Sequence, residues 1–315
     1  LARELVRSLG RMVVAIVDNN PNMVGVLEES LTVESPERLL DSSDTTLYYV
    51  ICTTSFTDVG EQLAGRGLSI GDDFCASPSL IGLQPVVALQ SLNRKLLFTS
   101  GFRPSEKPSS GGGLYLVEID GLDFSYRKLH SGTCHGMVQK NGMTFCVDQA
   151  QGILLFNEEF RVEKVYEIKP GQRPHGIDWC EQTGEFFVAA SRQDCILVFD
   201  EDFREVTRIS LSEKFRRSGV PVHHINDLCV VGTSVYATMF SLTGNYQHDV
   251  FDGVVLEVDA ATRRIVGPVF SNLWMPHNPK YLKDGLCVCD SLPGFLRRNN
   301  GQIAGNFPAF TRGLA

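Results

Sequence analysis

Thr133-Cys134-His135-Gly136-Met137 is repeated with variation as Arg173-Pro174-His175-Gly176-Ile177, and each copy stands just before a run of β-type residues. Two further histidine segments follow, His223-His224-Ile225-Asn226-Asp227 and Met275-Pro276-His277-Asn278-Pro279. Starting from His135, successive members of this series are 40, 49 and 53 residues apart. A repeat of roughly 40–50 residues is typical of a β-propeller, in which each unit forms one blade of four short strands.

The residues between the histidines fit the other strands of such blades. A glycine opens most second strands, an acid or amide ends each third strand, and the fourth strand is amphipathic. The second strands are predicted over 95–100, 142–148, 184–190, 232–238 and 285–291, the third over 113–120, 152–157, 195–200 and 253–259, and the fourth over 161–168, 205–211 and 263–269. This regularity indicates antiparallel blades. We count four clear blades, a fifth beginning at Met275 and a sixth beginning at Phe310, so we expect six blades in the full protein and about five in this chain.

The N-terminal part of the chain has a different pattern, in which helices and strands alternate. Helices are predicted over 1–9, 36–40 and 56–64, and strands over 12–17 and 46–52. Alternation of this kind is typical of a parallel sheet built from βαβ units. We therefore predict a multidomain chain, with a Rossmann-like α/β module over 1–78 and an all-β propeller over 79–315. The sequence begins without Met and in the middle of a unit, so we expect the first strand of the module, and residues that close the propeller, to lie outside it.

Asp18 is the candidate cofactor-binding residue of the α/β module. It follows the strand predicted over 12–17, where an acid of a Rossmann unit meets a ribose hydroxyl. The glycine-rich phosphate loop of such a unit would precede Leu1, so NAD or SAM binding is not expected in this chain. A turn residue within Asp18-Asn19-Asn20-Pro21 is the simpler interpretation.

The repeat also predicts a site. The first strand of each propeller blade lines the central channel, so the repeat register places four histidines around one axis: His135, His175, His224 and His277. Arg312 takes the matching place in the last blade, and Gln84-Pro85 takes it in the first. Neutral imidazoles are ligands for Fe, Zn or Cu, which makes these four histidines candidate metal ligands. A metal-free catalytic site that uses His175, His224 and Arg312, and a purely structural role, both stay open.

Composition limits the classes of partner. The net charge of −8 argues against a nucleic-acid or anionic-membrane surface. No apolar run approaches the roughly 18 residues of a membrane span. The nine cysteines form no CxxC pair, so we expect reduced thiols and a cytoplasmic location. The expected partner is a small molecule in the central channel; a protein partner also stays open.

Three segments of the second part resemble a bacterial β-propeller family of unknown function. They are residues 224–227, residues 275–279 together with Asp290-Ser291, and residues 310–315, and the resemblance spans about 83–315. It implies the fold and the place of the site, but no reaction. Asn278 and Lys280 depart from the family pattern, in which Ser and Arg are expected.

Two further resemblances bear on function. Residues 17–21, Gly25, 35–39 and 48–52 resemble the Rossmann-like C-terminal domain of sugar C-methyltransferases, which implies an accessory domain of a carbohydrate pathway. Pro174-His175-Gly176-Ile177 is similar to a motif of streptogramin lyases, and peptide-amidating lyases and carotenoid-cleaving oxygenases also hold metals on propeller axes. These resemblances imply a metal-dependent lyase or oxygenase. The alternative is a non-catalytic carbohydrate-, ligand- or protein-binding propeller, with residues 239–250 as a recognition loop at its rim.

Overall fold

The computed structural model describes residues 13–40, 47–53, 55–70, 72–77, 92–121, 123–283, 285–307 and 310–313. The chain divides into two compact units. One comprises residues 1–94 and 119–124, and the other comprises residues 95–118 and 125–315. The domain boundary predicted between residues 78 and 79, the helix predicted over 1–9 and the Gln84-Pro85 position lie outside the described residues.

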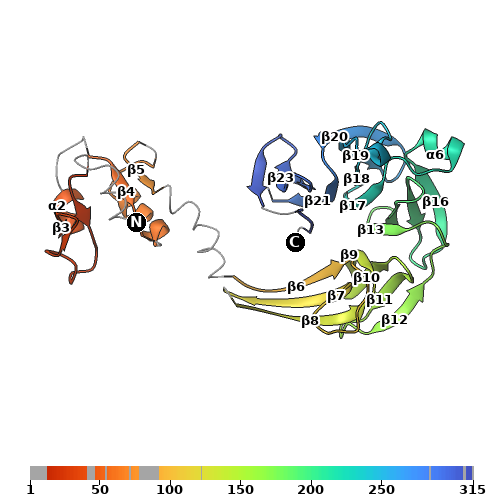
Figure 1. Cartoon of the computed structure of the whole chain (residues 1–315), viewed down its shortest axis with the longest axis horizontal. Helices are drawn as coiled ribbons and strands as arrows, with labels where there is room; N and C mark the ends of the chain where they lie inside the picture. Colours follow the sequence, from red (N-terminus) through yellow and green to blue (C-terminus); the bar gives the residue numbers. More distant parts are fainter. Residues whose placement is uncertain are drawn as a thin grey trace. The chain divides into compact units, whose positions relative to one another are not determined.

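The second unit is built from antiparallel sheets that follow one another along the chain, as Figure 1 shows. Blade one has three described strands, β6 (Asn93–Ser100), β7 (Gly113–Asp120) and β8 (Asp123–Ser131). Blade two has β9 (Cys134–Lys140), β10 (Met143–Asp148), β11 (Gly152–Phe156) and β12 (Val162–Tyr166), and blade three has β13 (Pro174–Cys180), β14 (Glu185–Ala190), β15 (Cys195–Phe199) and β16 (Glu205–Ser210). Blade four has β17 (Ile225–Val231), β18 (Ser234–Met239), β19 (Gly253–Asp259) and β20 (Ile265–Leu273), and blade five has β21 (Pro276–Leu282), β22 (Gly285–Asp290), β23 (Phe295–Arg298) and β24 (Ile303–Asn306).

This arrangement confirms the predicted blades and is that of a β-propeller. In each of the four complete blades the strands are paired in chain order. The strand that begins at a histidine segment is the first of each blade, and the first strands β9, β13, β17 and β21 contact one another in succession. The described part of the predicted sixth blade, residues 310–313, is not in a strand.

Glycine allows the first strands to approach closely. A Cβ atom at Gly136 would lie 2.7 Å from the Cα atom of Gly176, and one at Gly176 would lie 2.8 Å from the Cα atom of Asp227. Only a residue without a side chain fits at such distances. The His-Gly pairs of the sequence therefore have a structural reason: the glycine brings neighbouring blades together beside the histidine.

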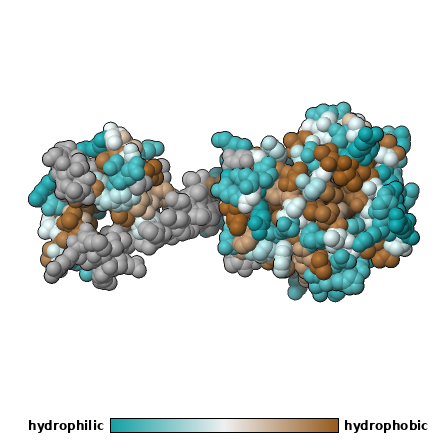
Figure 2. Space-filling model, turned by 90° about the horizontal axis from the view of Figure 1, so that it is seen from above, coloured by the Kyte–Doolittle hydropathy of each residue, from teal (hydrophilic) through white to brown (hydrophobic). Residues whose placement is uncertain are grey.

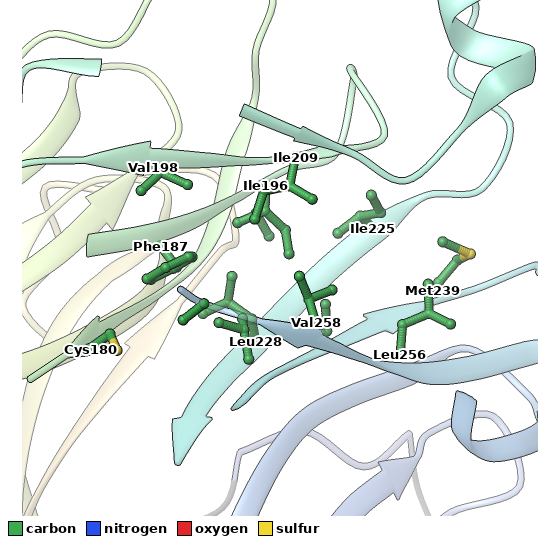
Figure 3. Packing of buried hydrophobic residues seen from close by; sticks show 14 of the residues in the cluster. Cys180, Phe187, Ile196, Val198, Ile209, Ile225, Leu228, Met239, Leu256 and Val258 are labelled. Atoms are coloured by element: carbon green, nitrogen blue, oxygen red, sulfur yellow. The ribbon is translucent and has the colours of Figure 1, made fainter. Parts of the chain in front are cut away.

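Apolar side chains between the blades form the core. The largest cluster joins blades three and four, and Figure 3 shows Phe187, Ile196, Leu228, Met239 and Val258 among its members. Further clusters lie between blades two and three and between blades four and five. Each fully buried Val, Leu, Ile, Phe or Met side chain contributes about 1.5–3 kcal/mol to the free energy of unfolding. Figure 2 shows hydrophilic residues over much of the rim of this unit and hydrophobic residues gathered toward the middle of the face in view.

The N-terminal unit only partly follows the prediction. The helices α2 (Pro36–Leu40) and α3 (Phe56–Gly65) are confirmed. Strand β1 (Ile16–Val17) pairs in parallel with β3 (Leu31–Glu34), β2 (Leu27–Glu28) pairs antiparallel with β3, and β4 (Tyr49–Ile51) pairs in parallel with β5 (Phe74–Ala76).

The described residues of this unit show two small separate sheets, and they do not show the predicted Rossmann-like module. The run over 12–17 predicted a strand buried on both faces, yet Val14 is 65% exposed and only Ile16 and Val17 are in a strand. A run of β-branched residues predicts a strand from composition alone. Here the residues before Ile16 are not buried by neighbouring strands, and the strand stays short. No helix in the described part of the chain is long and apolar enough to cross a membrane.

Candidate functional site: the axial cluster

Each first strand begins with a β-bulge, and the bulge fixes the position of one side chain per blade. The first regular pairs of these strands are Cys134 with Asp148, Pro174 with Ala190, Ile225 with Met239, and Pro276 with Asp290. The bulge follows this pair directly in β9, β13 and β17, and it follows the next pair, His277 with Cys289, in β21. The residue directly after the first-strand member of each first regular pair occupies the same position in every blade, which we call the equivalent position. It is occupied by His135, His175, Asn226 and His277.

This register corrects one feature of the sequence analysis. His224 is not equivalent to the other three histidines, because it precedes Ile225 instead of following it. It corresponds to Arg173 and Met275, and all three residues have a left-handed backbone, with φ of 55°, 49° and 55° respectively. The spacing between histidines could not show the difference, since Asn226 occupies the histidine position of blade four.

Arg312 continues the series after blade five. The backbone N–H of Asn278 donates to Oδ2 of Asp227 at 3.1 Å, and the backbone N–H of Gly313 donates to Oδ1 of Asn278 at 2.7 Å. These hydrogen bonds join residues that each lie one place after the equivalent position, namely Asp227, Asn278 and Gly313. By this hydrogen-bond pattern Arg312 corresponds to His277 of blade five.

The side chains of this series converge. The ring centroids of His135 and His175 are 4.0 Å apart, and those of His175 and His224 are 6.1 Å apart. Phe240 lies between His224 and His277, with centroid distances of 4.3 Å and 5.1 Å. We call the following residues the axial cluster: His135, His175, His224, Asn226, His277, Arg173 and Arg312.

Two members of the axial cluster are buried without hydrogen-bond partners. His175 is 4% exposed, and neither of its ring nitrogens has a partner among the described residues. Asn226 is 0% exposed, and neither polar atom of its side chain has a hydrogen-bond partner among the described residues. An unpaired buried polar group costs about 1–3 kcal/mol, so such groups point to a bound partner that completes them.

Two of the other histidines, His135 and His277, are held by neighbours. Nε2 of His135 lies 3.2 Å from Oε1 of Gln149. Nδ1 of His277 lies 2.8 Å from the carbonyl oxygen of Met275 and 2.8 Å from Oγ of Ser291. These contacts fix the orientation of both rings toward the cluster.

All four histidines are neutral near pH 7. Burial lowers the pKa of His135, His175 and His277, and it lowers the pKa of His224 to about 4. The positive charge of Arg312 is a further cause in all four cases. Neutral imidazole can both donate and accept a hydrogen bond and can also ligate a metal.

Two guanidinium groups add positive charge near the axial cluster. After burial, the charges of Arg173 and Arg312 are the causes that lower the pKa of His224. The carboxylate of Asp227 acts in the opposite direction on His135, but it already accepts the backbone N–H of Asn278. Burial also lowers the pKa of Arg173, as expected for a cation that lacks full solvation.

The loop that was predicted at the rim lies against the cluster. The ring of Tyr246, in the 3-10 helix η2 (Tyr246–His248), is 5.1 Å from that of His224. Asp252 fixes the base of the loop, because its carboxylate accepts the hydroxyl of Ser241 at 2.5 Å and the backbone N–H of Thr243 at 3.0 Å. Tyr246 is thus a contact residue that the histidine pattern did not include.

Asp18 lies in the N-terminal unit. Its Oδ1 atom accepts the backbone N–H of Asn20 at 2.8 Å, and its own N–H donates to the carbonyl of Glu34. These are the contacts of a turn residue.

A second group of donor atoms was missed by the sequence analysis. Among the described residues, the one set of three or more histidine, cysteine or acidic ligand atoms within 4.8 Å of one another is formed by His130, Cys134 and Asp148. This group could bind a metal. The axial histidines do not form such a group in this arrangement of their rings. His130 and Cys134 are separated by three residues, a gap that zinc ligand pairs use. Asp148 has no such spacing to them, because the pairing of β9 with β10 brings it beside Cys134.

No family model matches the chain, and no curated protein sequence matches it. Several solved structures of β-propeller-like proteins are similar in fold. Virginiamycin B lyase from Staphylococcus aureus is 11% identical over 69% of this chain and 75% of that chain, with a TM-score of 0.43. A nidogen/laminin complex is 12% identical over 65% of this chain and 73% of that chain, with a TM-score of 0.47. The periplasmic gluconolactonase of Pseudomonas aeruginosa is 14% identical over 65% of this chain and 65% of that chain, with a TM-score of 0.42. The chain is thus similar to β-propeller proteins with different activities, and this likeness concerns the fold alone.

Proposed function

We propose that the axial cluster binds a small molecule that carries a carboxylate or a phosphate group. The observation that carries the proposal is His175, which is buried between His135 and His224 with both ring nitrogens unpaired among the described residues. A ligand with acceptor oxygens supplies the missing partner of the ring N–H, since a neutral imidazole donates from one nitrogen and accepts at the other. The unpaired amide of Asn226, at the equivalent position of the next blade, offers a further donor and acceptor.

The two arginines supply the charge that such a ligand requires. A guanidinium group binds carboxylates and phosphates through two parallel hydrogen bonds, and these bonds are stronger when water is excluded. Arg312 stands in the ring of equivalent positions, and Arg173 corresponds to His224. We assign Arg312 the role of anchor for the anionic group.

His175 and His224 are the groups that would move a proton if the bound molecule is converted. Their low pKa makes them weak bases in the free protein. A bound anion favours the protonated imidazole and raises the pKa of a neighbouring histidine. Ligand binding would therefore prepare these residues for acid–base work. If the ligand is held but not converted, the same site is that of a binding module.

Isothermal titration of the full chain with malonate and with inorganic phosphate tests the proposal. Arg312→Gln should weaken binding at least about 10-fold, which corresponds to about 1.4 kcal/mol. The control is Arg204→Gln, because Arg204 is paired with Asp202 at the exposed turn that leads into β16. Equal affinities of the two variants, or no binding of either anion by the unmodified chain, would overturn the proposal.

A metal site on His135, His175, His224 and His277 is the second candidate, and it would make the protein a metal-dependent lyase or oxygenase. The observation in its favour is that all four imidazoles are in the neutral form that ligates Fe, Zn or Cu. Such a metal would polarise a carbonyl group or activate oxygen. The charges of Arg173 and Arg312 oppose a divalent cation, which is why we prefer the anion.

Metal analysis after reconstitution decides between the two candidates. The measurement is made on Cys134→Ser, so that the group of His130, Cys134 and Asp148 does not contribute. About one equivalent of Fe, Zn or Cu, lost in the double variant His175→Ala/His224→Ala, would favour the metal site. Less than about 0.1 equivalent would exclude it.

A further inference from the structure

His130, Cys134 and Asp148 face one another between blades one and two. His130 lies near the end of β8, Cys134 is the first residue of β9, and Asp148 is the last residue of β10. Oδ2 of Asp148 is 3.9 Å from Nε2 of His130 and 4.0 Å from Sγ of Cys134. Ligand atoms on a tetrahedral zinc ion are about 3.3–3.8 Å apart, given metal–ligand bonds of about 2.0–2.3 Å. The three side chains are therefore near the separation at which one ion would join them.

The carboxylate of Asp148 lacks the cation that an equivalent residue has. Asp290 in blade five holds the same register position, and its Oδ2 atom accepts Nε of Arg297 at 2.7 Å. The residue that corresponds to Arg297 in blade two is Leu154, which is buried and apolar. Asp148 is 0% exposed, and a carboxylate in that position needs a positive charge nearby.

Backbone donors satisfy Asp148 only in part. Oδ1 accepts the N–H groups of Ala150 and Gln151 at 2.8 Å and 3.0 Å, and Oδ2 accepts that of Thr133 at 3.0 Å. The remaining neighbours of Oδ2 are distant, because the thiol of Cys134 donates to it over 4.0 Å and Nε2 of His130 lies 3.9 Å away.

The space in which the donor atoms meet is kept open by a glycine. A Cβ atom at Gly132 would lie 2.0 Å from Oδ2 of Asp148 and 3.0 Å from Nε2 of His130. Any side chain at residue 132 would fill the gap between the two donor groups.

We propose that His130, Cys134 and Asp148 bind one zinc ion, which neutralises Asp148 and links blade one to blade two. A thiolate, an imidazole and a carboxylate together form a donor set that suits zinc. Ligands from both blades make the ion a cross-link that stabilises the folded chain. The inference rests on observations separate from those at the axial cluster.

Cobalt(II) titration of the chelator-treated full chain tests the proposal. Cobalt(II) replaces zinc in such sites and gives a thiolate-to-cobalt charge-transfer absorption. We expect about one equivalent of cobalt per chain, with displacement of the band by zinc. Cys134→Ser should abolish the band, and Asp148→Asn should weaken cobalt binding at least about 10-fold. Cys195→Ser, which removes another buried thiol in blade three, should leave the band intact.

His130→Asn tests the site without replacing a fully buried residue, because His130 is partly exposed. It keeps the proposal testable if the variants at Cys134 or Asp148 fail to fold. It should weaken cobalt binding while the near-UV circular dichroism of the chain is unchanged. Arg312→Gln should keep the band, so failure of the axial site and failure of the zinc site are distinguishable. Absence of the band in the unmodified chain, or its survival in Cys134→Ser, would overturn the proposal. Loss of stability in His130→Asn without any metal dependence would show a simple ion pair with Asp148 and would overturn it too.

Discussion

The ring centroids of His135 and His175 lie 4.0 Å apart, although 40 residues separate the two in sequence. The contact arises because Gly136 and Gly176 let the first strands of blades two and three approach closely. His175 is left buried between two other imidazoles, without hydrogen bonds to the described residues. The strand register thus creates both the site and its main energetic cost.

The cost at His175 can be removed by an apolar side chain of similar size. We expect His175→Met to raise the free energy of unfolding by about 1 kcal/mol, because no buried polar group then remains unpaired at this position. Chemical denaturation measures the change. The same variant should lose malonate binding. A fall in stability of about 1 kcal/mol or more would contradict the unpaired state of this imidazole.

Stability should depend on pH through His224. Its pKa is about 4 in the folded chain because of burial and then the charges of Arg173 and Arg312, against 6.5 for an ordinary histidine. Between these values the unfolded state binds a proton that the folded state does not, so the free energy of unfolding falls as the pH drops from about 6.5 to about 4. His224→Gln should remove up to about 3 kcal/mol of that fall.

Denaturation curves near pH 7 and near pH 4.5 give this difference directly. His248→Gln is the matched control, because His248 is an exposed histidine of the same blade, at the end of η2. The control should show the full fall of the unmodified chain. Identical pH dependence in both variants would contradict a lowered pKa at His224.

The close approach of blades three and four makes Gly176 sensitive to substitution. In Gly176→Ala the new methyl group would lie 2.7 Å from the backbone nitrogen of Leu228, so the strands must separate. We expect a loss of at least about 2 kcal/mol of unfolding free energy, in the range of overpacked cores. Gly65→Ala serves as the control, because nothing lies within 4 Å of its Cβ position, and its unfolding should change little.

The link from Asp227 to Asn278 should contribute to the joint between blades four and five. Asp227 is buried and its carboxylate accepts the backbone N–H of Asn278 at 3.1 Å. Asp227→Ala leaves that N–H without its acceptor and should cost about 1–3 kcal/mol. Asp202→Ala, at an exposed turn, should change the free energy of unfolding by less than about 0.5 kcal/mol. If both variants changed the free energy of unfolding by the same small amount, the hydrogen bond from Asn278 to Asp227 would contribute nothing to stability.

The blades could be predicted from the sequence because local signals specify them. A glycine at the start of the second strand, as at Gly142 and Gly285, has the positive φ that a tight hairpin requires. Alternation then fixes which residues face the core. The correspondence of Arg312 to the histidines rests on the same kind of signal, since Arg312-Gly313 repeats the pattern of His175-Gly176.

The remaining features depend on contacts that sequence spacing does not encode. Asn226 takes the place of a histidine, and only the pairing of Ile225 with Met239 reveals it. His130 and Asp148 meet across two blades, so no local motif joins them. The N-terminal unit lacks the sheet that its composition predicted, because a β-branched run such as the one before Asp18 forms a long strand only where neighbouring strands bury it.

Titration of the histidine side chains by NMR, with and without malonate, tests the axial anion site most directly. The account predicts a pKa of about 4 for His224 in the free chain and a clear rise when malonate binds, because the anion stabilises the protonated ring. The rise should disappear in Arg312→Gln and persist in Arg204→Gln. An unchanged pKa of His224 at saturating malonate would contradict the account.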